Sequence, residues 1–227
     1  MVVNVVTVEE FRSKALKAVD IYLKKPEDER KPCMFVLDSL GMLSTEKEIT
    51  DALNDKQVRD MTKSQLIKGA FRMLTLKLGQ ANIPMIVTNH TYDVIGSYVP
   101  TKEMGGGSGL KYAASTIIHL SKKKEKDGTE VVGNIIKAKT AKSRLSKENK
   151  DVEIRLYYDD RGLDRYYSLL ELGEIGGLWK NLAGRYEIDG KKVYAKAVYK
   201  DPEKYFTAEV MDKLNEISKQ EFSYGAG

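Results

Sequence analysis

The 227-residue sequence predicts an α/β fold, in which parallel strands and an antiparallel extension form a mixed sheet flanked by helices. Two continuous apolar runs, 33–37 and 85–87, are typical of buried parallel strands. A helical pattern over 58–78 separates them, and three closely spaced strand-like runs follow later in the chain. Strands that alternate with helices indicate a parallel sheet, whereas closely spaced strands favour antiparallel pairing.

The N-terminal segment predicts a short strand over 2–6 and then a helix. Thr7 and Glu10 have the spacing of a capping box, in which the Thr7 side chain caps the helix and the Glu10 carboxylate reaches back. Apolar residues recur behind them at helical spacing, namely Phe11, Ala15, Val19 and Leu23. The charged segment 26–32 is expected to form a turn.

The central helix over 58–78 is expected to bury one apolar face and to end at Asn82-Ile83-Pro84. That face contains Ile67, Phe71, Leu74 and Leu78. A polar stretch then leads into the glycine-rich segment 104–109. This segment predicts a mobile loop, because consecutive glycines favour no regular element.

The C-terminal part predicts strands at 116–120, 131–138 and 152–158, followed by a final helix over 202–222. Asp201-Pro202-Glu203 indicates the helix start, because proline is favoured in the first helical turn. The apolar face of this helix comprises Phe206, Val210, Leu214 and Ile217.

Composition excludes several classes of protein. With one cysteine, Cys33, and two histidines, the chain cannot form a disulfide framework or a structural zinc site of four Cys and His ligands. No apolar run approaches the about 18 residues that a membrane-spanning helix needs, and none has the layout of a signal peptide. We therefore expect the reducing cytoplasm as the compartment.

The net charge of +5 is concentrated in one segment. Residues 122–150 contain ten basic and four acidic residues, an excess of +6, so that the rest of the chain sums to −1. Concentrated positive charge indicates a polyanion such as phosphate or nucleic acid. A solvated lysine-rich hairpin is the alternative, and charge alone leaves both open.

Polar residues follow the two apolar runs. Asp38 comes directly after 33–37, at the strand end where open α/β sheets bind ligands, and such a carboxylate can hold the waters around a nucleotide's Mg²⁺. Asn89 and His90 follow 85–87 and could sense a phosphate beside Asp38. A capping Asp, a turn-forming Asn and an idle His are the alternatives.

Basic residues also alternate at strand spacing from Lys137 to Arg144, where they could contact a phosphate or solvate an exposed strand edge. A phosphate-cradling P-loop, Gly-x-x-x-x-Gly-Lys-Ser/Thr, is absent from these 227 residues. The glycines at 105–109 are followed by Leu110, and Tyr112 stands where the hydroxyl residue is needed.

The sequence resembles the RecA-class recombinases, and among them most closely the phage UvsX recombinases, from about Val2 to Ile217. The resemblance rests on a series of blocks in the same order: Phe35-Val36-Leu37-Asp38-Ser39-Leu40-Gly41, Asp51-Ala52-Leu53-Asn54, Arg59-Asp60-Met61-Thr62, Ile83-Pro84, Asn89-His90-Thr91-Tyr92, Met104-Gly105-Gly106-Gly107 and Lys142-Ser143-Arg144. Several ordered blocks carry the resemblance, where one alone would not. It implies a RecA-like ATPase core that uses ATP and Mg²⁺.

The resemblance also implies roles at the nucleotide. Asp38 matches the Walker B aspartate, which holds Mg²⁺ through water, and Ser39 is its neighbour. Asn89 and His90 match the positions that read the γ-phosphate and couple it to DNA binding.

Lys142 and Arg144 match two basic residues that reach the ATP of a neighbouring subunit. A cation supplied in this way stabilises charge on the transferring phosphoryl group.

For DNA, the resemblance matches 44–59 to a first DNA-binding loop and 91–107 to a second. The residues that it implies as DNA contacts are Arg59, Tyr92, Tyr98, Lys102, Gly105, Gly106 and Gly107. The two tyrosines could stack on bases, at about 1–3 kcal/mol each.

The function implied is that of an ATP-dependent recombinase and DNA-dependent ATPase in recombinational DNA repair. It would assemble on single-stranded DNA as a helical filament and pair that strand with a homologous duplex. Phage single-strand-binding and mediator proteins are the implied partners, in the cytoplasm of an infected bacterial cell.

In the family, the Walker A loop, the catalytic glutamate and a polymerisation segment lie upstream of the part that matches here. We therefore expect this chain alone to bind ATP poorly and to lack turnover, with a separate polypeptide as one source of the P-loop half. The expected domains are 1–170, the C-terminal portion of the core with both DNA-binding loops, and 171–227, a small C-terminal region. Without the P-loop half, apolar strand edges and faces would be uncovered.

Two alternatives remain from the sequence. A non-catalytic DNA-binding or filament-modulating module could keep the loops without the ATPase. A metal-dependent nuclease built on Asp38 is less supported, because no motif places a second acidic residue.

Overall fold

The computed structural model of the chain describes residues 1–56, 60–93 and 102–225. It divides into two compact units, unit 1 (Met1–Ala114) and unit 2 (Ser115–Gly227). Each unit has a hydrophobic core of its own. The sequence-based domain boundary at 170 stays a prediction.

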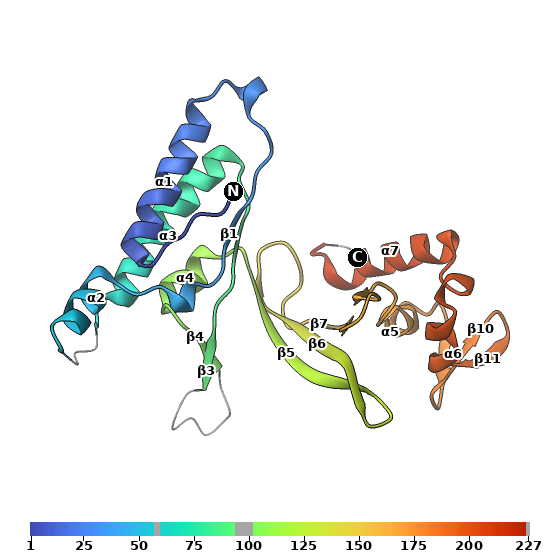
Figure 1. Cartoon of the computed structure of the whole chain (residues 1–227). Coiled ribbons are helices and arrows are strands. Elements are labelled where there is room, and N and C mark those ends of the chain that lie inside the picture. Colours follow the sequence, from blue (N-terminus) through green and yellow to red (C-terminus); the bar gives the residue numbers. More distant parts are fainter. Residues whose placement is uncertain (57–59, 94–101, 226–227) are drawn as a thin grey trace. The chain divides into compact units, whose positions relative to one another are not determined.

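Unit 1 combines helices with two short two-stranded sheets (Figure 1). Its elements are α1 (Val8–Lys24), β1 (Phe35–Leu37), α2 (Glu46–Leu53), α3 (Lys63–Ala81), β2 (Met85–Val87), β3 (Thr91–Asp93), β4 (Lys102–Met104) and α4 (Ser108–Ala113), with 3₁₀ helices at Glu27–Glu29 and Leu40–Met42. The long helices α1 and α3 run side by side (Figure 1). Their apolar faces form most of the core.

Helix α1 begins as predicted, with one difference in its cap. Thr7 Oγ1 accepts a hydrogen bond from the Glu10 amide at 3.1 Å, as in a capping box. The Glu10 carboxylate, however, accepts a hydrogen bond from the amide of Val6, the residue before the cap, at 2.9 Å. The predicted inner face is confirmed, since Phe11, Ala15 and Val19 are buried.

The predicted strand over 2–6 is wrong. The contacts there are an isolated parallel bridge between Thr7 and Ser44, with Val8 N donating to Ser44 O at 2.9 Å. Val2 is 93% exposed. A strand needs a continuous ladder of hydrogen bonds to a neighbour, and one bridge does not supply it.

Strands β1 and β2 pair in parallel, as predicted, with Val36 directly opposite Ile86. Leu37 is buried in the core, whereas Val36 and Ile86 are 61% and 51% exposed. Parallel sheets are usually covered on both faces, and this pair is covered on one.

Helix α3 confirms the predicted apolar face, because Ile67, Phe71, Leu74 and Leu78 are all buried. It ends at Asn82, which adopts a left-handed conformation with φ 51°. Such a residue closes a helix by accepting the conformation that most side chains avoid.

The glycine-rich segment forms a turn between β4 and α4, so the expectation that no regular element occurs there is wrong, whereas its mobility stays a prediction. β3 and β4 pair antiparallel, the Gly105 amide donates to His90 O at 3.2 Å, and α4 begins at Ser108. Gly106 and Gly107 have φ values of 92° and 73°. These values lie where only glycine is unstrained, so the glycines permit this turn.

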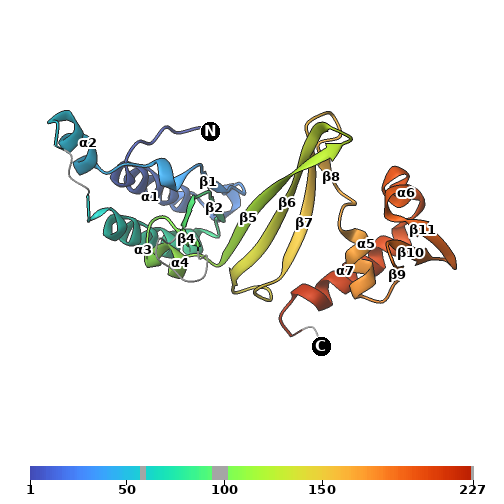
Figure 2. The ribbon, with the colours of Figure 1, turned by 90° about the horizontal axis from the view of Figure 1, so that it is seen from below.

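Unit 2 consists of a twisted four-stranded sheet and a smaller three-stranded one, with helices around the latter (Figure 2). Its elements are β5 (Thr116–Asp127), β6 (Glu130–Ser143), β7 (Asp151–Tyr157), β8 (Leu163–Asp164), α5 (Leu169–Ile175), β9 (Lys180–Leu182), β10 (Arg185–Ile188), β11 (Lys191–Tyr194), α6 (Ala195–Lys200), a 3₁₀ helix (Pro202–Lys204) and α7 (Ala208–Phe222). The order β5-β6-β7-β8 is antiparallel throughout, which confirms the predicted pairing.

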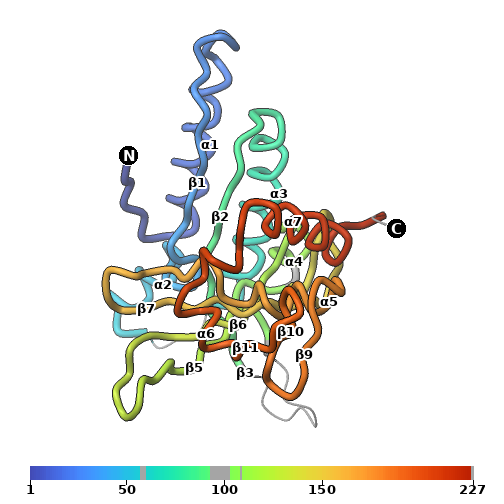
Figure 3. The backbone as a smooth tube through the Cα atoms, turned by 90° about the vertical axis from the view of Figure 1, so that its right-hand side faces the viewer, coloured from blue at the N-terminus to red at the C-terminus, as the bar shows by residue number. Residues whose placement is uncertain are grey.

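The core of unit 2 lies among α5, α6, α7 and the three-stranded sheet, which are traced together in Figure 3. Trp179 is central to it, and its indole N–H donates to Leu170 O at 2.6 Å. A Cβ on Gly173 would lie 2.2 Å from the Trp179 ring, so only glycine fits there. α5, α6 and the three-stranded sheet were not predicted from the sequence.

The final helix begins later than predicted. Pro202 starts a separate 3₁₀ helix, and α7 begins at Ala208 after Thr207, whose side chain accepts from the Val210 amide at 3.4 Å. A threonine cap therefore sets the start, rather than the proline. No helix among the described residues is long and apolar enough to cross a bilayer.

Candidate functional site

The carboxyl ends of β1 and β2 lie side by side in unit 1. Thr88 Oγ1 donates to Asp38 Oδ1 at 2.6 Å, and the Thr88 amide donates to Leu37 O at 3.0 Å. The structure thus places Asp38 and the residues after β2 at one edge. Asp38 is exposed, and its following peptide bond to the half-buried Ser39 is cis.

Asn89 joins this edge to the glycine turn. Its Nδ2 donates to Gly105 O at 2.7 Å, and its Oδ1 accepts from the His90 amide at 2.9 Å. A Cβ on Gly41 would lie 3.4 Å from Asn89 Oδ1 and 3.7 Å from the His90 ring. Asp38, Asn89 and His90 therefore belong to one continuous site.

The glycine turn in turn packs against the first turns of α3. A Cβ on Gly107 would lie 3.4 Å from Ser64 Cβ, and one on Gly109 would lie 2.6 Å from Lys68 Cβ. Ser64 and Lys68 themselves are exposed. The turn after β4 and the start of α3 thus form one polar surface, which we call the glycine-turn surface.

Sequence reasoning missed Ser64 and Lys68. The signal was present, because Ser64, Lys68 and Arg72 recur every four residues on the exposed side of α3.

Of the predicted DNA contacts, the structure describes some completely, one only in its backbone and two not at all. Tyr92 lies on β3 and is 58% exposed, close to Gly105, whose added Cβ would lie 3.1 Å from the Tyr92 ring. The backbone of Lys102 lies on β4, and its side chain is not described. Arg59 and Tyr98 lie outside the described residues.

Lys142 and Arg144 lie at the end of β6 in unit 2, on either side of the buried Ser143. Lys142 is half-buried and Arg144 is exposed, with the Arg144 amide bonded to Ser115 O at 3.0 Å. The Ser143 hydroxyl accepts from the Ser146 amide at 2.9 Å, which folds the chain after Arg144 into a tight turn.

The C-terminal end of α7 fastens the connection between β6 and β7. The Lys147 amide and Nζ donate to Phe222 O and Gln220 O, both at 2.7 Å. Tyr224 Oη donates to Ser143 O at 3.3 Å, and Lys150 pairs with Glu221. Residues distant in sequence therefore hold the turn that presents Arg144.

The lysines of the basic segment divide between the two faces of the β5–β6 hairpin. On one face Lys123 pairs with Glu153 at 3.0 Å and Lys137 pairs with Asp151 at 2.9 Å. Lys122, Lys124 and Lys126 alternate with Lys123 along β5 and therefore lie on the other face. Their partners on β6 are Ile136, Asn134 and Val131. In the described part of the chain, none of these three lysines forms an ion pair.

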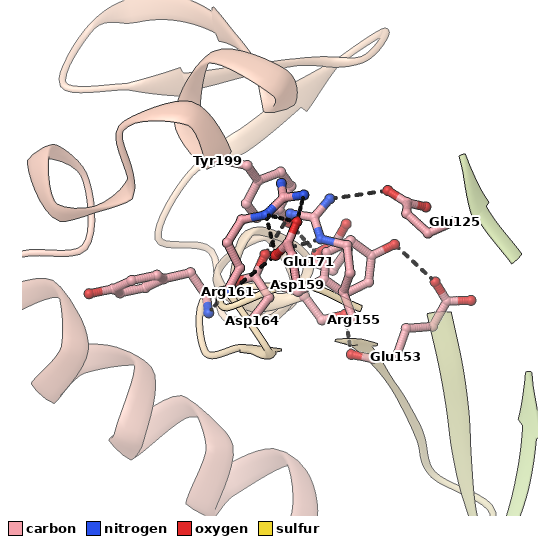
Figure 4. Close-up of polar contacts among 11 residues, drawn as sticks. Glu125, Glu153, Arg155, Asp159, Arg161, Asp164, Glu171 and Tyr199 are labelled. Atoms are coloured by element: carbon pink, nitrogen blue, oxygen red, sulfur yellow. Dashed lines mark hydrogen bonds and ion pairs between the residues drawn. The ribbon is translucent and has the colours of Figure 1, made fainter. Parts of the chain in front are cut away.

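Arg155 forms a cluster that sequence reasoning did not foresee (Figure 4). Its side chain is 11% exposed and pairs with Asp164 at 2.6 Å and Glu125 at 3.5 Å. The guanidinium lies 4.5–5.1 Å from three ring centroids, those of Tyr157, Tyr167 and Tyr199. Burial raises the pKa of Tyr167 to about 12, so its ring stays neutral beside Arg155. The cluster joins β7 to α6, and we interpret its role as the stabilisation of unit 2.

No group of three or more His, Cys, Asp or Glu side chains that could hold a metal occurs within the residues described.

Comparison with known proteins places residues 14–164 in a match to the family model of the RecA N-terminal domain. The chain is 39% identical over 151 residues to a recombination and repair protein of Enterobacteria phage T4, a match that covers 66% of this chain and 38% of that protein. It is 30% identical over 162 residues to protein RecA of Chloroherpeton thalassium, a match that covers 70% of this chain and 44% of that protein. It is also 30% identical over 189 residues to protein RecA of Clavibacter michiganensis, a match that covers 80% of this chain and 51% of that protein. The chain thus spans about two fifths to one half of these relatives.

Proposed function

The chain belongs to the RecA family, and on that premise we propose that it is part of an ATP-dependent recombinase that binds single-stranded DNA and pairs it with a homologous duplex. The proposal includes self-association into a helical filament and DNA-dependent ATP hydrolysis by the assembled protein. Single-strand-binding and mediator proteins would be its partners in DNA recombination and repair.

The nucleotide side of the proposal rests on the edge beside β1. Asp38 fits a Mg²⁺ ligand that acts through water, because its carboxylate is exposed and Thr88 orients one oxygen. Mg²⁺ usually keeps several waters and takes one or two carboxylates together with substrate phosphates. When bound, Mg²⁺ and ATP would supply the phosphoryl group and the charge that neutralises it.

Lys142 and Arg144 would contribute cations to the ATP of a neighbouring subunit. The fastened turn after β6 supports this role, because a cation on a loop needs neighbours that hold its position.

The hydrogen bond from Asn89 Nδ2 to Gly105 O is the observation that carries the proposal. One side chain spans the strand end next to Asp38 and the turn that would contact DNA. A phosphate sensed at Asn89 or His90 would therefore shift the glycine turn directly, and this would couple ATP to DNA affinity.

The DNA side of the proposal is the glycine-turn surface. Ser64, Lys68 and the amides of Gly106 and Gly107 would contact phosphates, and Tyr92 would stack on a base. Such contacts do not distinguish one base from another. The affinity for DNA should therefore depend strongly on salt concentration and little on the base sequence.

Helix α2 belongs to the first predicted DNA-binding loop but is acidic. The segment 45–56 contains four carboxylates, Glu46, Glu48, Asp51 and Asp55, against two lysines. It is therefore a weaker candidate for phosphate contact than α3.

A second candidate function is a non-catalytic DNA-binding module. It is favoured by the lysine row of β5, Lys122, Lys124 and Lys126, which forms no ion pair within the described residues.

Fluorescence anisotropy with a labelled oligo(dT) separates the two functions. If the chain is part of a recombinase, Mg²⁺ and ATP should tighten oligo(dT) binding once a P-loop-bearing half of a relative is added, and Asn89→Ala should abolish this effect. If it is a non-catalytic module, binding should be sensitive to salt and unchanged by ATP under every condition. Absence of salt-sensitive binding would contradict both.

A further inference from the structure

Asp60 is the one charged side chain that is buried among the residues that the structure describes. The residue is 6% exposed and its side chain 0%. A buried carboxylate is costly unless hydrogen bonds and charge compensate it. Asp60 has such compensation, yet no step of the proposed function uses it.

Three short hydrogen bonds reach Asp60 from two sides. Thr45 Oγ1 donates to Oδ2 at 2.6 Å, and Thr62 donates to Oδ1 through its amide at 2.8 Å and its hydroxyl at 2.6 Å. Lys47 Nζ lies 3.8 Å from Oδ1. The hydrogen bond from Thr45, followed by those from Thr62, lowers the pKa of Asp60 to about 2, so the carboxylate is ionised.

The donors stand at the starts of two helices. Thr45 is the N-cap of α2, where its side chain accepts from the Glu48 amide at 3.0 Å, and Thr62 precedes the first residue of α3. Negative charge is favourable at a helix N-terminus, and here one carboxylate serves two of them. An ion pair between Glu48 and Lys63, at 3.2 Å, links the same two helices.

We propose that Asp60 is a positioning residue for DNA binding, because the Thr45–Asp60–Thr62 clasp holds the first turn of α3 against the glycine turn. The inference rests on the proposed function of the glycine-turn surface. Ser64 lies two residues after Thr62 and Lys68 one helical turn later. An added Cβ on Gly107 would lie in ordinary contact with Ser64, at 3.4 Å, whereas one on Gly109 would lie only 2.6 Å from Lys68 Cβ. The start of α3 and the glycine turn are therefore in direct contact, and a small shift of α3 would separate them.

The clasp also explains why α3 begins at Lys63 rather than at 58, where the apolar pattern starts. Asp60 turns its side chain to the Thr62 amide, which would otherwise lack an intrahelical partner.

The test measures oligo(dT) affinity of the full chain by anisotropy over a series of KCl concentrations. Asp60→Asn and Thr45→Val break the clasp, whereas Thr45→Ser keeps the hydroxyl. Val19→Ala is the control for stability alone, since Val19 is 0% exposed in the core of the same unit and lies on α1, away from the clasp. Thermal unfolding is measured for every variant.

We expect Asp60→Asn and Thr45→Val to weaken oligo(dT) binding by about tenfold, the effect of losing one charge-assisted contact, that of Lys68 with a phosphate. The slope of log affinity against log salt should fall as well, because the Lys68 contact is lost. Thr45→Ser should retain the affinity and the salt slope of the parent chain. Val19→Ala should lower the unfolding temperature while leaving the affinity and the salt slope unchanged.

If the clasp variants lose stability but bind oligo(dT) like Val19→Ala, Asp60 is only structural and the inference is wrong. If the parent chain shows no salt-dependent binding, the proposed function fails, and the inference fails with it. Should Asp60→Asn not fold, Thr62→Val removes a single hydrogen bond and gives the same comparison.

Discussion

Thr88 Oγ1 lies 2.6 Å from Asp38 Oδ1, and this hydrogen bond ties the carboxyl end of β2 to that of β1. It sets the direction of the exposed Asp38 carboxylate before any ligand arrives. Because both side chains are exposed, the contact adds little to stability and more to orientation.

Thr88→Val removes this hydroxyl with little change in shape. We expect the free energy of unfolding to change by less than about 1 kcal/mol. The enhancement of oligo(dT) affinity by Mg²⁺ and ATP, measured in the presence of the P-loop half, should be lost. Thr88→Ser serves as the control and should retain it. Full enhancement in Thr88→Val would show that Asp38 needs no orienting partner.

Gly107 has φ 73° and ψ −175°, a conformation that only glycine adopts without strain. Gly107→Ala should therefore destabilise unit 1 by about 1–3 kcal/mol in urea unfolding. Gly69→Ala is the matched control, because Gly69 lies inside α3 with nothing within 4 Å of an added Cβ. That substitution should stabilise the chain by about 0.5–1 kcal/mol. Equal effects of the two would contradict the geometry of the turn.

Arg155→Lys tests the cluster of Figure 4. Lysine keeps the charge but loses the paired hydrogen bonds to Asp164 and the stacking on three rings. We expect a loss of about 2–4 kcal/mol in the stability of unit 2. Arg161→Lys, at a side chain that is 56% exposed, should cost less than about 1 kcal/mol. Chemical denaturation followed by Trp179 fluorescence reports on unit 2.

The low pKa of Asp60 makes its contribution to stability dependent on pH. The folded pKa of about 2 lies below the ordinary aspartate pKa of 3.8, so the stabilisation is complete above about pH 4 and is lost as the pH falls towards 2. The difference in unfolding free energy between the parent chain and Asp60→Asn should therefore shrink over this window. Taking the difference cancels carboxylates common to both, such as Asp159. A constant difference from pH 5 to pH 2 would contradict the assigned hydrogen bonds.

The lysine row of β5 predicts a change in salt dependence. Replacing Lys122, Lys124 and Lys126 by Gln should reduce the slope of log affinity for oligo(dT) against log salt by about 2, at roughly 0.7 per phosphate contact. The control replaces Lys123 and Lys137, which pair with Glu153 and Asp151 on the other face. If both sets change the slope equally, the hairpin is a solvated face rather than a phosphate surface.

Sequence patterns predicted those elements whose signals are local. The apolar spacing of α1 and α3 and the runs that became β1 and β2 depend on neighbouring residues, and all four elements are present. The alternation along β5 to β7 likewise predicted antiparallel pairing. Element starts were predicted less well, since Asp60 and Thr207 set the starts of α3 and α7 through side-chain hydrogen bonds.

The candidate site was predictable as a set of residues but not as an arrangement. Asp38, Asn89 and His90 were named from their place after apolar strands, and ordered sequence blocks identified the family. The glycines at 105–109 gave no sign of the turn that they form, because their conformations are selected by His90, Asn89 and α3.

By itself, the sequence determined the fold class, the family and the identity of the polar residues at the strand ends, because these follow from local periodicity and from ordered motifs. Tertiary structure alone decided which residues meet: Ser64 with Gly107, Thr45 with Asp60, and Tyr224 with Ser143. Such contacts join residues from 15 to 81 positions apart. No local pattern encodes them, because they form only when packed helices and strands bring distant backbone together.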